Sequence, residues 1–153
     1  MRFSGRRTIV SILLLSATLA GSAGTAAPAS ATTIVNPYER RMVYLINKAR
    51  LQAGVPALQY SSALSGLART HSALMAKHGT IFHTYNLAYV LRNFSWSLAG
   101  ENVGMGPSID LLHQAFMASP LHRRNNLERH FHRIGVGVVW KNGVAFITVD
   151  FLS

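Results

Sequence analysis

The chain contains no cysteine, so its fold must be stable without a disulfide bond. The absence also excludes thiolate metal ligands, a thiol nucleophile and a lipid attached through an N-terminal cysteine. A chain of 153 residues suits one domain, and a domain of that size can bury a real core. Hydrophobic residues make up 49% of the chain and charged residues only 13%, which excludes a disordered polypeptide.

The first 31 residues have the three parts of a secretory signal peptide. Three arginines within the first seven positions precede an apolar run at 9–20, and Ala29-Ser30-Ala31 fits an A-x-A cleavage site. The run is shorter than the about 20 residues that a membrane-spanning helix needs, although an uncleaved N-terminal anchor is the alternative. We predict cleavage after Ala31, no transmembrane segment afterwards, and export. The general secretory route is preferred to the twin-arginine route that Arg6 and Arg7 also suggest.

Removal of the predicted signal peptide leaves a basic domain. Three of the 15 Lys and Arg residues lie in it, so 12 basic residues remain against 5 acidic ones, a formal net charge of +7. Such a charge attracts anionic wall polymers, phospholipid headgroups or nucleic acid. No helix-turn-helix, zinc-finger or stacking pattern is present, so no nucleic-acid partner is expected. Export without cysteine favours a bacterial product.

Helical spacing dominates the first half of the predicted domain, 36–153, which follows a short linker at 32–35. Asn36 is a good N-cap, Pro37 suits the first helical position, and Glu39 is placed to complete a capping box. Further helices are predicted from Ser61 or Ser62 to Gly79, around 87–92, and from Ser108 until Pro120 interrupts the last.

The end of the chain has the two-residue periodicity of strands. Large apolar residues alternate with small ones, mostly glycine, from Ile134 to Trp140, which predicts a strand. Asn142-Gly143 is typical of a type I′ hairpin turn, and 144–151 is predicted to be the partner strand. Another short strand is predicted at 99–103. Three main helices followed by this hairpin predict an α+β domain.

Few residues in this chain are candidates for chemistry. Glu101 lies in an apolar segment flanked by glycines, and a buried carboxylate needs a cation, a metal or several hydrogen-bond donors. A purely structural glutamate, bound by backbone amides or an arginine, is the alternative. His83 and His122 lack a helical or strand pattern that would explain them by packing.

The other charged side chains have simpler interpretations. His71 is expected to be a hydrogen-bonded core residue, whereas the remaining histidines are expected at the surface: His78, His113, His130 and His132. Four arginines fall within eleven residues and predict either an anion-binding patch or an ordinary solvated basic face: Arg123, Arg124, Arg129 and Arg133.

Several segments, in this order, resemble the CAP superfamily, whose SCP-like domains occur in cysteine-rich secretory proteins, insect venom allergens and plant pathogenesis-related proteins. The match is to a bacterial branch without disulfides. It extends over 36–153 and rests on these segments: Asn47-Lys48-Ala49-Arg50, Ala68-Arg69-Thr70-His71-Ser72, Phe82-His83, Gly100-Glu101-Asn102-Val103, the block 119–127, Ile134-Gly135-Val136-Gly137-Val138 and Asp150-Phe151.

The resemblance implies a three-layer α-β-α sandwich with a central antiparallel sheet. It also implies a cleft lined by two histidines and two acids, of which His83, Glu101 and His122 are three. The second acid falls near Ser119, where this chain has serine. Some members of the superfamily bind zinc at the two histidines, and lipid binding and proteolysis are claimed for others.

These residues leave the chemistry of the cleft open. His83 and His122 could bind Zn²⁺ or another divalent metal weakly, with Glu101 as the third ligand or as an orienting carboxylate. A carboxylate beside an imidazole also predicts that one histidine titrates above its usual pKa when no metal is bound. Ser119 as a nucleophile is imaginable, but no oxyanion hole is evident.

The sequence therefore predicts a monomeric secreted CAP-domain protein that binds a ligand in the His83, Glu101, His122 and Ser119 cleft, at the cell wall or in the extracellular space. Its partner would be a small molecule, a lipid or an anionic wall polymer. The alternatives are a metal-dependent hydrolase that uses the same cleft, and a basic protein that binds wall polymers through the arginines.

Overall fold

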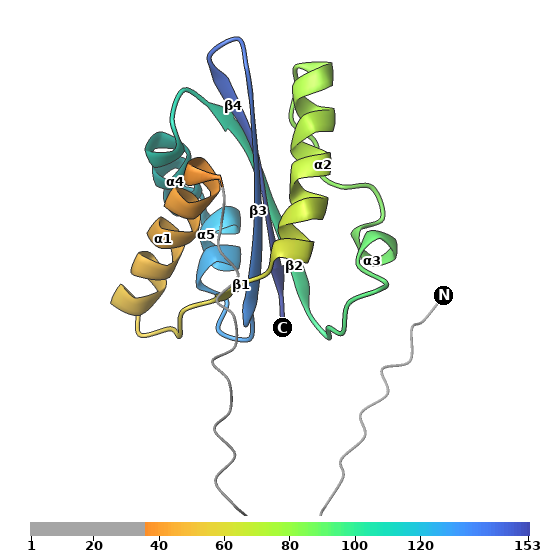
Figure 1. The fold of residues 1–153 in the computed structure, drawn as a ribbon. Helices are drawn as coiled ribbons and strands as arrows, with labels where there is room; N and C mark the ends of the chain where they lie inside the picture. The colour runs from red at the N-terminus through yellow and green to blue at the C-terminus, as the bar shows by residue number, and fades with distance from the viewer. Residues whose placement is uncertain (1–35) are drawn as a thin grey trace, which may run out of the picture. The chain divides into compact units, whose positions relative to one another are not determined.

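A computed structural model describes residues 36–153, so the predicted signal peptide (1–31) and linker (32–35) lie outside the described residues. The elements are α1 (Pro37–Gln52), β1 (Gln59–Tyr60), α2 (Ser62–His78), α3 (Leu87–Val90), β2 (Ala99–Gly106), α4 (Ile109–Ala118), α5 (Pro120–Leu127), β3 (Arg133–Lys141) and β4 (Val144–Leu152). Figure 1 shows three layers, with α1, α4 and α5 on one face of the sheet and α2 and α3 on the other. The α+β class and the sandwich are confirmed. No helix between 36 and 153 is long and apolar enough to cross a membrane.

The sheet is mixed rather than wholly antiparallel. Its order is β1-β3-β4-β2, and β4 pairs antiparallel with both of its neighbours. The two-residue strand β1 pairs parallel with β3, which corrects the predicted antiparallel sheet at this edge. Parallel neighbours need a crossover connection, and the chain from α2 to α5 supplies it. The predicted hairpin turn is confirmed by positive φ angles of 51° at Asn142 and 75° at Gly143.

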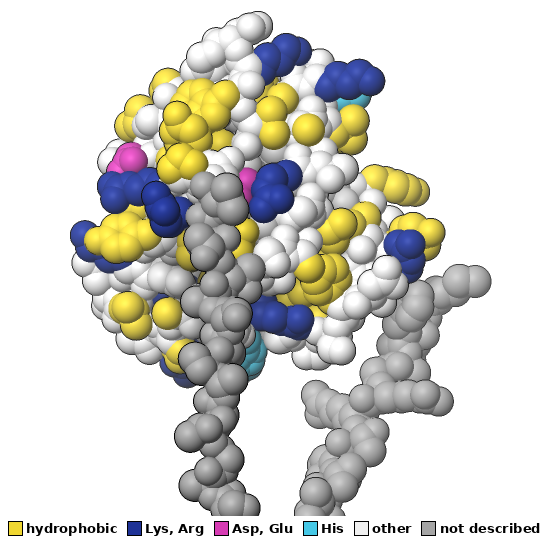
Figure 2. All heavy atoms as spheres, viewed as in Figure 1, with side chains coloured by type: hydrophobic (Ala, Val, Ile, Leu, Met, Phe, Trp, Pro, Cys, Tyr) yellow, Lys and Arg dark blue, Asp and Glu magenta, His cyan; other side chains and the backbone are white. Residues whose placement is uncertain are grey.

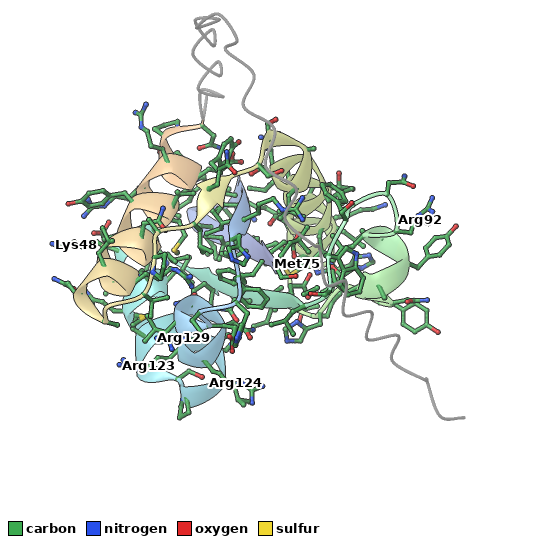
Figure 3. The ribbon with its side chains drawn as sticks, turned by 90° about the horizontal axis from the view of Figure 1, so that it is seen from below. Lys48, Met75, Arg92, Arg123, Arg124 and Arg129 are labelled. Carbon is green, nitrogen blue, oxygen red and sulfur yellow. The ribbon has the colours of Figure 1, made fainter. Side chains whose placement is uncertain are left out.

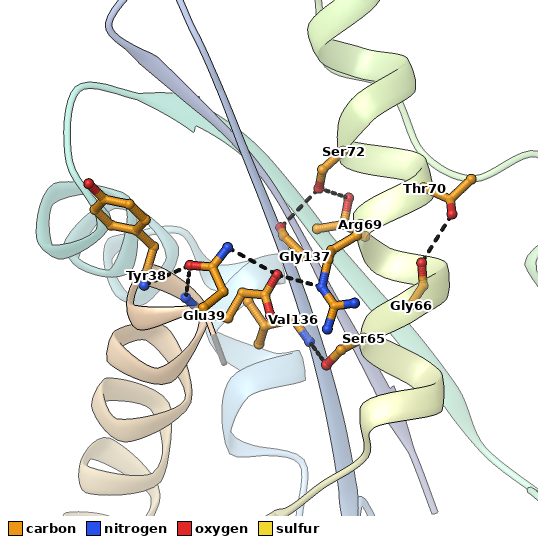
Figure 4. Close-up of polar contacts among 11 residues, drawn as sticks. Tyr38, Glu39, Ser65, Gly66, Arg69, Thr70, Ser72, Val136 and Gly137 are labelled. Carbon is orange, nitrogen blue, oxygen red and sulfur yellow. Dashed lines mark hydrogen bonds and ion pairs between the residues drawn. The ribbon is translucent and has the colours of Figure 1, made fainter. Parts of the chain in front are cut away.

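The first helix begins where the sequence predicts, but Glu39 has a second role. The Asn36 side chain accepts hydrogen bonds from the backbone N–H groups of Tyr38 and Glu39, as an N-cap does. The Glu39 carboxylate is fully buried and accepts a hydrogen bond of 2.8 Å from Arg69 Nε on α2 (Figure 4). The predicted capping box is formed only in part: Glu39 Oε1 accepts from the Asn36 side-chain amide at 3.4 Å, and the same oxygen joins α1 to α2 through Arg69.

Helix α2 lies unusually close to the sheet. Ser72 Oγ is 2.9 Å from the Gly137 carbonyl oxygen, and the Val136 N–H donates to Ser65 Oγ at 2.9 Å (Figure 4). A Cβ atom on Gly137 would lie 2.2 Å from the Ala68 backbone, so only glycine fits there. The alternating glycines of β3 thus make room for α2.

Pro120 starts a helix rather than only ending one. Ser119 is the C-cap of α4 and the N-cap of α5, and Pro120 is the first residue of α5. Proline is tolerated at that position because its missing N–H would have no helical partner. The prediction of three main helices missed α5. This helix is fastened to β2 by the Asn102 amide, which donates to the His122 carbonyl and to Asn126 Oδ1, both at 3.0 Å.

Arg50 is fully buried in the last turn of α1, and the sequence named it only as part of a family segment, without a role. Its guanidinium donates to four backbone carbonyls, those of Pro56, Asn126, Glu128 and Phe131, at 2.7–3.2 Å. Burial lowers the pKa of Arg50. The side chain joins α1 to the C-terminal end of α5 and to the turn that follows it.

Candidate functional site

Glu101 lies on β2, and its buried carboxylate is satisfied by three donors from one loop. Oε1 accepts from the Thr84 N–H at 2.9 Å and lies 2.8 Å from His83 Nδ1, while Oε2 accepts from Thr84 Oγ1 at 2.5 Å. The His83 side chain remains 65% exposed although its partner is almost fully buried. Because a carboxylate can only accept, the proton of the neutral imidazole sits on Nδ1, and Nε2 is left for another contact.

His122 lies on α5 and is oriented by different groups. Its Nδ1 is 2.9 Å from Ser119 Oγ, and its ring stacks on Phe116 with centroids 5.1 Å apart. Burial first, and then the charge of His83, lower the pKa of His122. A raised pKa was predicted for one of the two histidines from a neighbouring carboxylate. The neighbour of His122 is a hydroxyl, and burial and the charge of His83 shift its pKa in the opposite direction.

The two histidine clusters flank one strand. Glu101 and Asn102 are consecutive on β2, so they point to opposite faces of the sheet, Glu101 to His83 and Asn102 to α5. β2 is an edge strand of the sheet. His83 with Glu101 therefore lies on one side of this edge and His122 with Ser119 on the other, close enough for the charge of His83 to affect His122.

The donor set is short of what a catalytic zinc site requires. Within residues 36–153 no group of three His, Cys, Asp or Glu side chains is placed to hold a metal ion. Both Glu101 oxygens are engaged by Thr84 and His83, and Ser119 offers a hydroxyl where a carboxylate would be needed. Two imidazoles fall below the three protein ligands that such sites use. Zinc binding by His83 and His122 stays a prediction.

The four predicted anion-binding arginines separate into two kinds. Arg123, Arg124 and Arg129 are exposed, and Figure 3 shows them together beside α5. Arg133 is half-buried, and its guanidinium donates to the carbonyls of Ser95 and Ser153. Arg133 therefore connects the loop at Ser95 to Ser153. The exposed cluster consists of Arg123, Arg124 and Arg129.

The remaining histidines follow the predictions only in part. His71 Nε2 is 2.7 Å from the Phe82 carbonyl oxygen, which confirms the predicted hydrogen bond, but the residue is half-buried rather than in the core. His78, His130 and His132 are exposed, as predicted. His113 is half-buried rather than a surface residue, and burial lowers its pKa. The prediction was wrong because this side of α4 packs towards α1.

Two residues of this region were missed. Thr84 supplies two of the three donors to Glu101, and its place directly after His83 was the available indication. Asp150 lies opposite Glu101 in the β2–β4 ladder and is only 3% exposed. Burial, and then the negative charge of Glu101, raise the pKa of Asp150 well above its usual range. An acid in an otherwise apolar strand was the indication there.

Comparison with known proteins agrees with this fold and these motifs. The family model described as CAP, the cysteine-rich secretory protein family, matches residues 43–151. The chain is 35% identical over 117 residues to the uncharacterized protein YkwD of Bacillus subtilis strain 168, an alignment that covers 72% of this chain and 46% of YkwD. The chain thus spans less than half the length of this curated relative.

Two solved structures show the same arrangement. An extracellular protein containing an SCP domain from Bacillus anthracis strain Ames superposes with a TM-score of 0.70 and 26% identity, over 84% of this chain and 44% of that one. An outer surface protein of Borrelia burgdorferi gives a TM-score of 0.69 with 17% identity, over 74% of this chain and 90% of that one, and shows the fold alone. The chain therefore belongs to the CAP family, in a form without cysteine.

Proposed function

We propose that this protein is an exported binding module that holds an anionic ligand at the free edge of β2. The observation that carries the proposal is the pair of oriented imidazoles there. His83 is fixed through Nδ1 by Glu101, and His122 is fixed through Nδ1 by Ser119. Each ring keeps Nε2 for a ligand, and a protonated imidazole donates its Nε2–H to an anionic group. A hydrogen-bonding group held in place loses little freedom on binding.

The site of action is outside the cytoplasm in this proposal. The predicted signal peptide supports export, and the relatives described as an extracellular protein and as an outer surface protein support the same location. The cell wall or the surrounding medium is the compartment in which the module would meet its ligand.

The charge of the described domain favours an anionic ligand, and an anionic wall polymer is the candidate that this charge would attract. Figure 2 shows a face on which Lys and Arg side chains far outnumber Asp and Glu. Two of the acidic side chains are already neutralised, Glu39 by Arg69 and Asp110 by Arg41. Arg123 directly follows His122 on α5, so the exposed arginine cluster begins on the same short helix as that imidazole.

Retention of the purified domain on insoluble, polymer-bearing bacterial wall fragments tests this proposal. Replacing Arg123, Arg124 and Arg129 together by serine should lower binding at low salt on the order of tenfold and flatten its salt dependence, because exposed charges act through a screened field. His83→Ala and His122→Ala should each weaken binding while the salt dependence persists.

Arg92→Ser is the matched control, because Arg92 is an exposed arginine beside α3, away from α5 (Figure 3). Unchanged retention in both histidine variants would contradict the proposal that His83 and His122 bind the ligand. If only the arginine variant lost binding, the protein would be a basic polymer-binding protein that does not use the cleft.

A metal-dependent hydrolase is the second candidate, and the position of Ser119 makes it testable. Ser119→Glu would add a carboxylate next to His122 and complete three ligands with the two imidazoles. We expect zinc affinity to rise at least about tenfold in this variant and to be lost again on adding His122→Ala. Ser119→Gln is the control of similar size without charge. Equal zinc affinity in the wild type, both Ser119 variants and His83→Ala would contradict a metal site.

A further inference from the structure

A cavity lies on the opposite side of the sheet from α5, between α2 and the segment that contains α3. Its volume is about 550 Å³, within the roughly 300–1,000 Å³ of small-molecule sites. Most of its wall is apolar and comes from these side chains: Leu67, Ala73, Leu74, Phe82, Leu87 and Val90. Neither His122 nor Ser119 lines it.

Asp150 is the polar group in this wall that lacks a partner. Thr148, two residues earlier on β4, has its Oγ1 2.9 Å from Ser72 Oγ of α2, so Asp150 points to the same side of the sheet. The Asp150 side chain has no hydrogen bond to any residue in 36–153, and Oδ1 is a buried oxygen without a partner. Buried polar atoms nearly always have one, so Asp150 Oδ1 is a hydrogen-bonding atom that a molecule in this cavity can satisfy.

The neighbours of Asp150 restrict the charge of that group. Glu101 lies directly across the ladder and is the negative charge that faces Asp150. A ligand carboxylate placed there would lie beside both Asp150 and Glu101 and would be repelled by the negative charge of Glu101. A cationic head would share the cavity with the ammonium group of Lys77, which also lines it. An uncharged oxygen meets neither penalty, and a protonated Asp150 can donate its O–H to it.

We propose that this cavity binds an uncharged amphiphilic small molecule, whose apolar body lies between α2 and α3 and whose hydroxyl or carbonyl oxygen accepts a hydrogen bond from Asp150. The proposal goes beyond the anionic ligand of the β2 edge, because it concerns a different cavity, residue and ligand charge. The two sites share only the loop of His83 and Thr84.

Calorimetric titration of the domain with three eight-carbon probes tests the proposal. The probes are 1-octanol, octanoate and octylamine, which share a chain of eight carbons and carry an uncharged hydroxyl, an anionic carboxylate and a cationic ammonium head group. We expect 1-octanol to bind at least about tenfold more tightly than either charged probe, because only its head group is not penalised by Glu101 or Lys77. Absence of 1-octanol binding, or equal binding of octanoate, would overturn the proposal.

Variants locate the site. Asp150→Asn keeps an N–H donor and should retain 1-octanol binding, whereas Asp150→Leu should weaken it roughly tenfold, since a buried hydroxyl then lacks its partner. Leu74→Asp, at a side chain that is 44% exposed, changes the cavity wall with little risk to folding and should also abolish binding. His122→Ala should leave 1-octanol binding unchanged even if it abolishes binding to wall fragments. Wild-type affinity in both Asp150→Leu and Leu74→Asp would show that the cavity is not the site.

Discussion

Gly137→Ala is expected to lower the free energy of unfolding by about 3 kcal/mol or more, at the upper end of what overpacking costs. The added Cβ would lie 2.2 Å from the Ala68 carbonyl carbon and the Arg69 nitrogen, which are backbone atoms of α2. A flexible side chain could turn aside, but a helix backbone can only move as a unit. Such a shift would also strain the contact between Ser72 Oγ and the Gly137 carbonyl.

Urea denaturation followed by circular dichroism measures this effect, and α2 itself provides the control. Gly66→Ala adds the same methyl group at a helical position where nothing lies within 4 Å of the new Cβ. That substitution should stabilise the domain by about 0.5–1 kcal/mol, because glycine is unfavourable inside a helix. A loss below about 1 kcal/mol for Gly137→Ala would mean that α2 does not rest on β3 as closely as described.

The glycines of β3 illustrate what the sequence reveals and what it withholds. Alternation from Ile134 to Trp140 predicts the strand, because periodicity is a local property of the chain. The reason for Gly137 is not local, since it depends on Ala68, a residue of α2 far away in the sequence. Asn36 and the Asn142-Gly143 turn were predicted, because helix caps and tight turns are also local. The strand β1 was not, because its two residues pair with a strand 74 positions later.

The candidate site divides in the same way. His83 and Glu101 were singled out because their segments lack an explanation by packing, and the structure places them 2.8 Å apart. The second acid near the cluster, Asp150, was overlooked, because only the pairing of β2 with β4 puts it opposite Glu101. Glu39 was assigned only to a local capping box, whereas its partner Arg69 lies 30 residues away. Partners that are distant in the sequence give no periodic pattern.

Arg50 is the strongest case of such a hidden partner, and its removal is the second large effect that we expect. Arg50→Met keeps most of the apolar stem but removes the guanidinium, so four carbonyls lose a donor at once. The bonds to Asn126 and Phe131 are buried, and the Glu128 carbonyl keeps the Phe131 N–H as a donor. Each buried polar group left unpaired costs about 1–3 kcal/mol, although neighbouring groups share part of the loss. We expect a decrease of about 3–5 kcal/mol, a large fraction of the roughly 5–15 kcal/mol that stabilises a typical domain.

The control for Arg50 lies on the same helix. Arg40 is exposed, and Arg40→Met should change the free energy of unfolding by no more than about 0.5 kcal/mol. Arg50→Lys keeps a positive charge but has one nitrogen in place of the planar guanidinium, so it should recover only part of the stability. Stability within about 1 kcal/mol of wild type in Arg50→Met would show that solvent or a rearranged turn satisfies the carbonyls.

The consequence of losing Arg50 should extend to the proposed binding site. Two of its acceptors, the carbonyls of Asn126 and Glu128, lie at the C-terminal end of α5, whose first turn carries His122. Without the guanidinium, amide hydrogen exchange should quicken at residues 126–131 well before global unfolding, because local opening needs fewer contacts broken. Wall-fragment binding should weaken at temperatures where the sheet remains protected. Faster exchange spread evenly over the whole domain would mean instead that Arg50 supports the core without holding α5 in place.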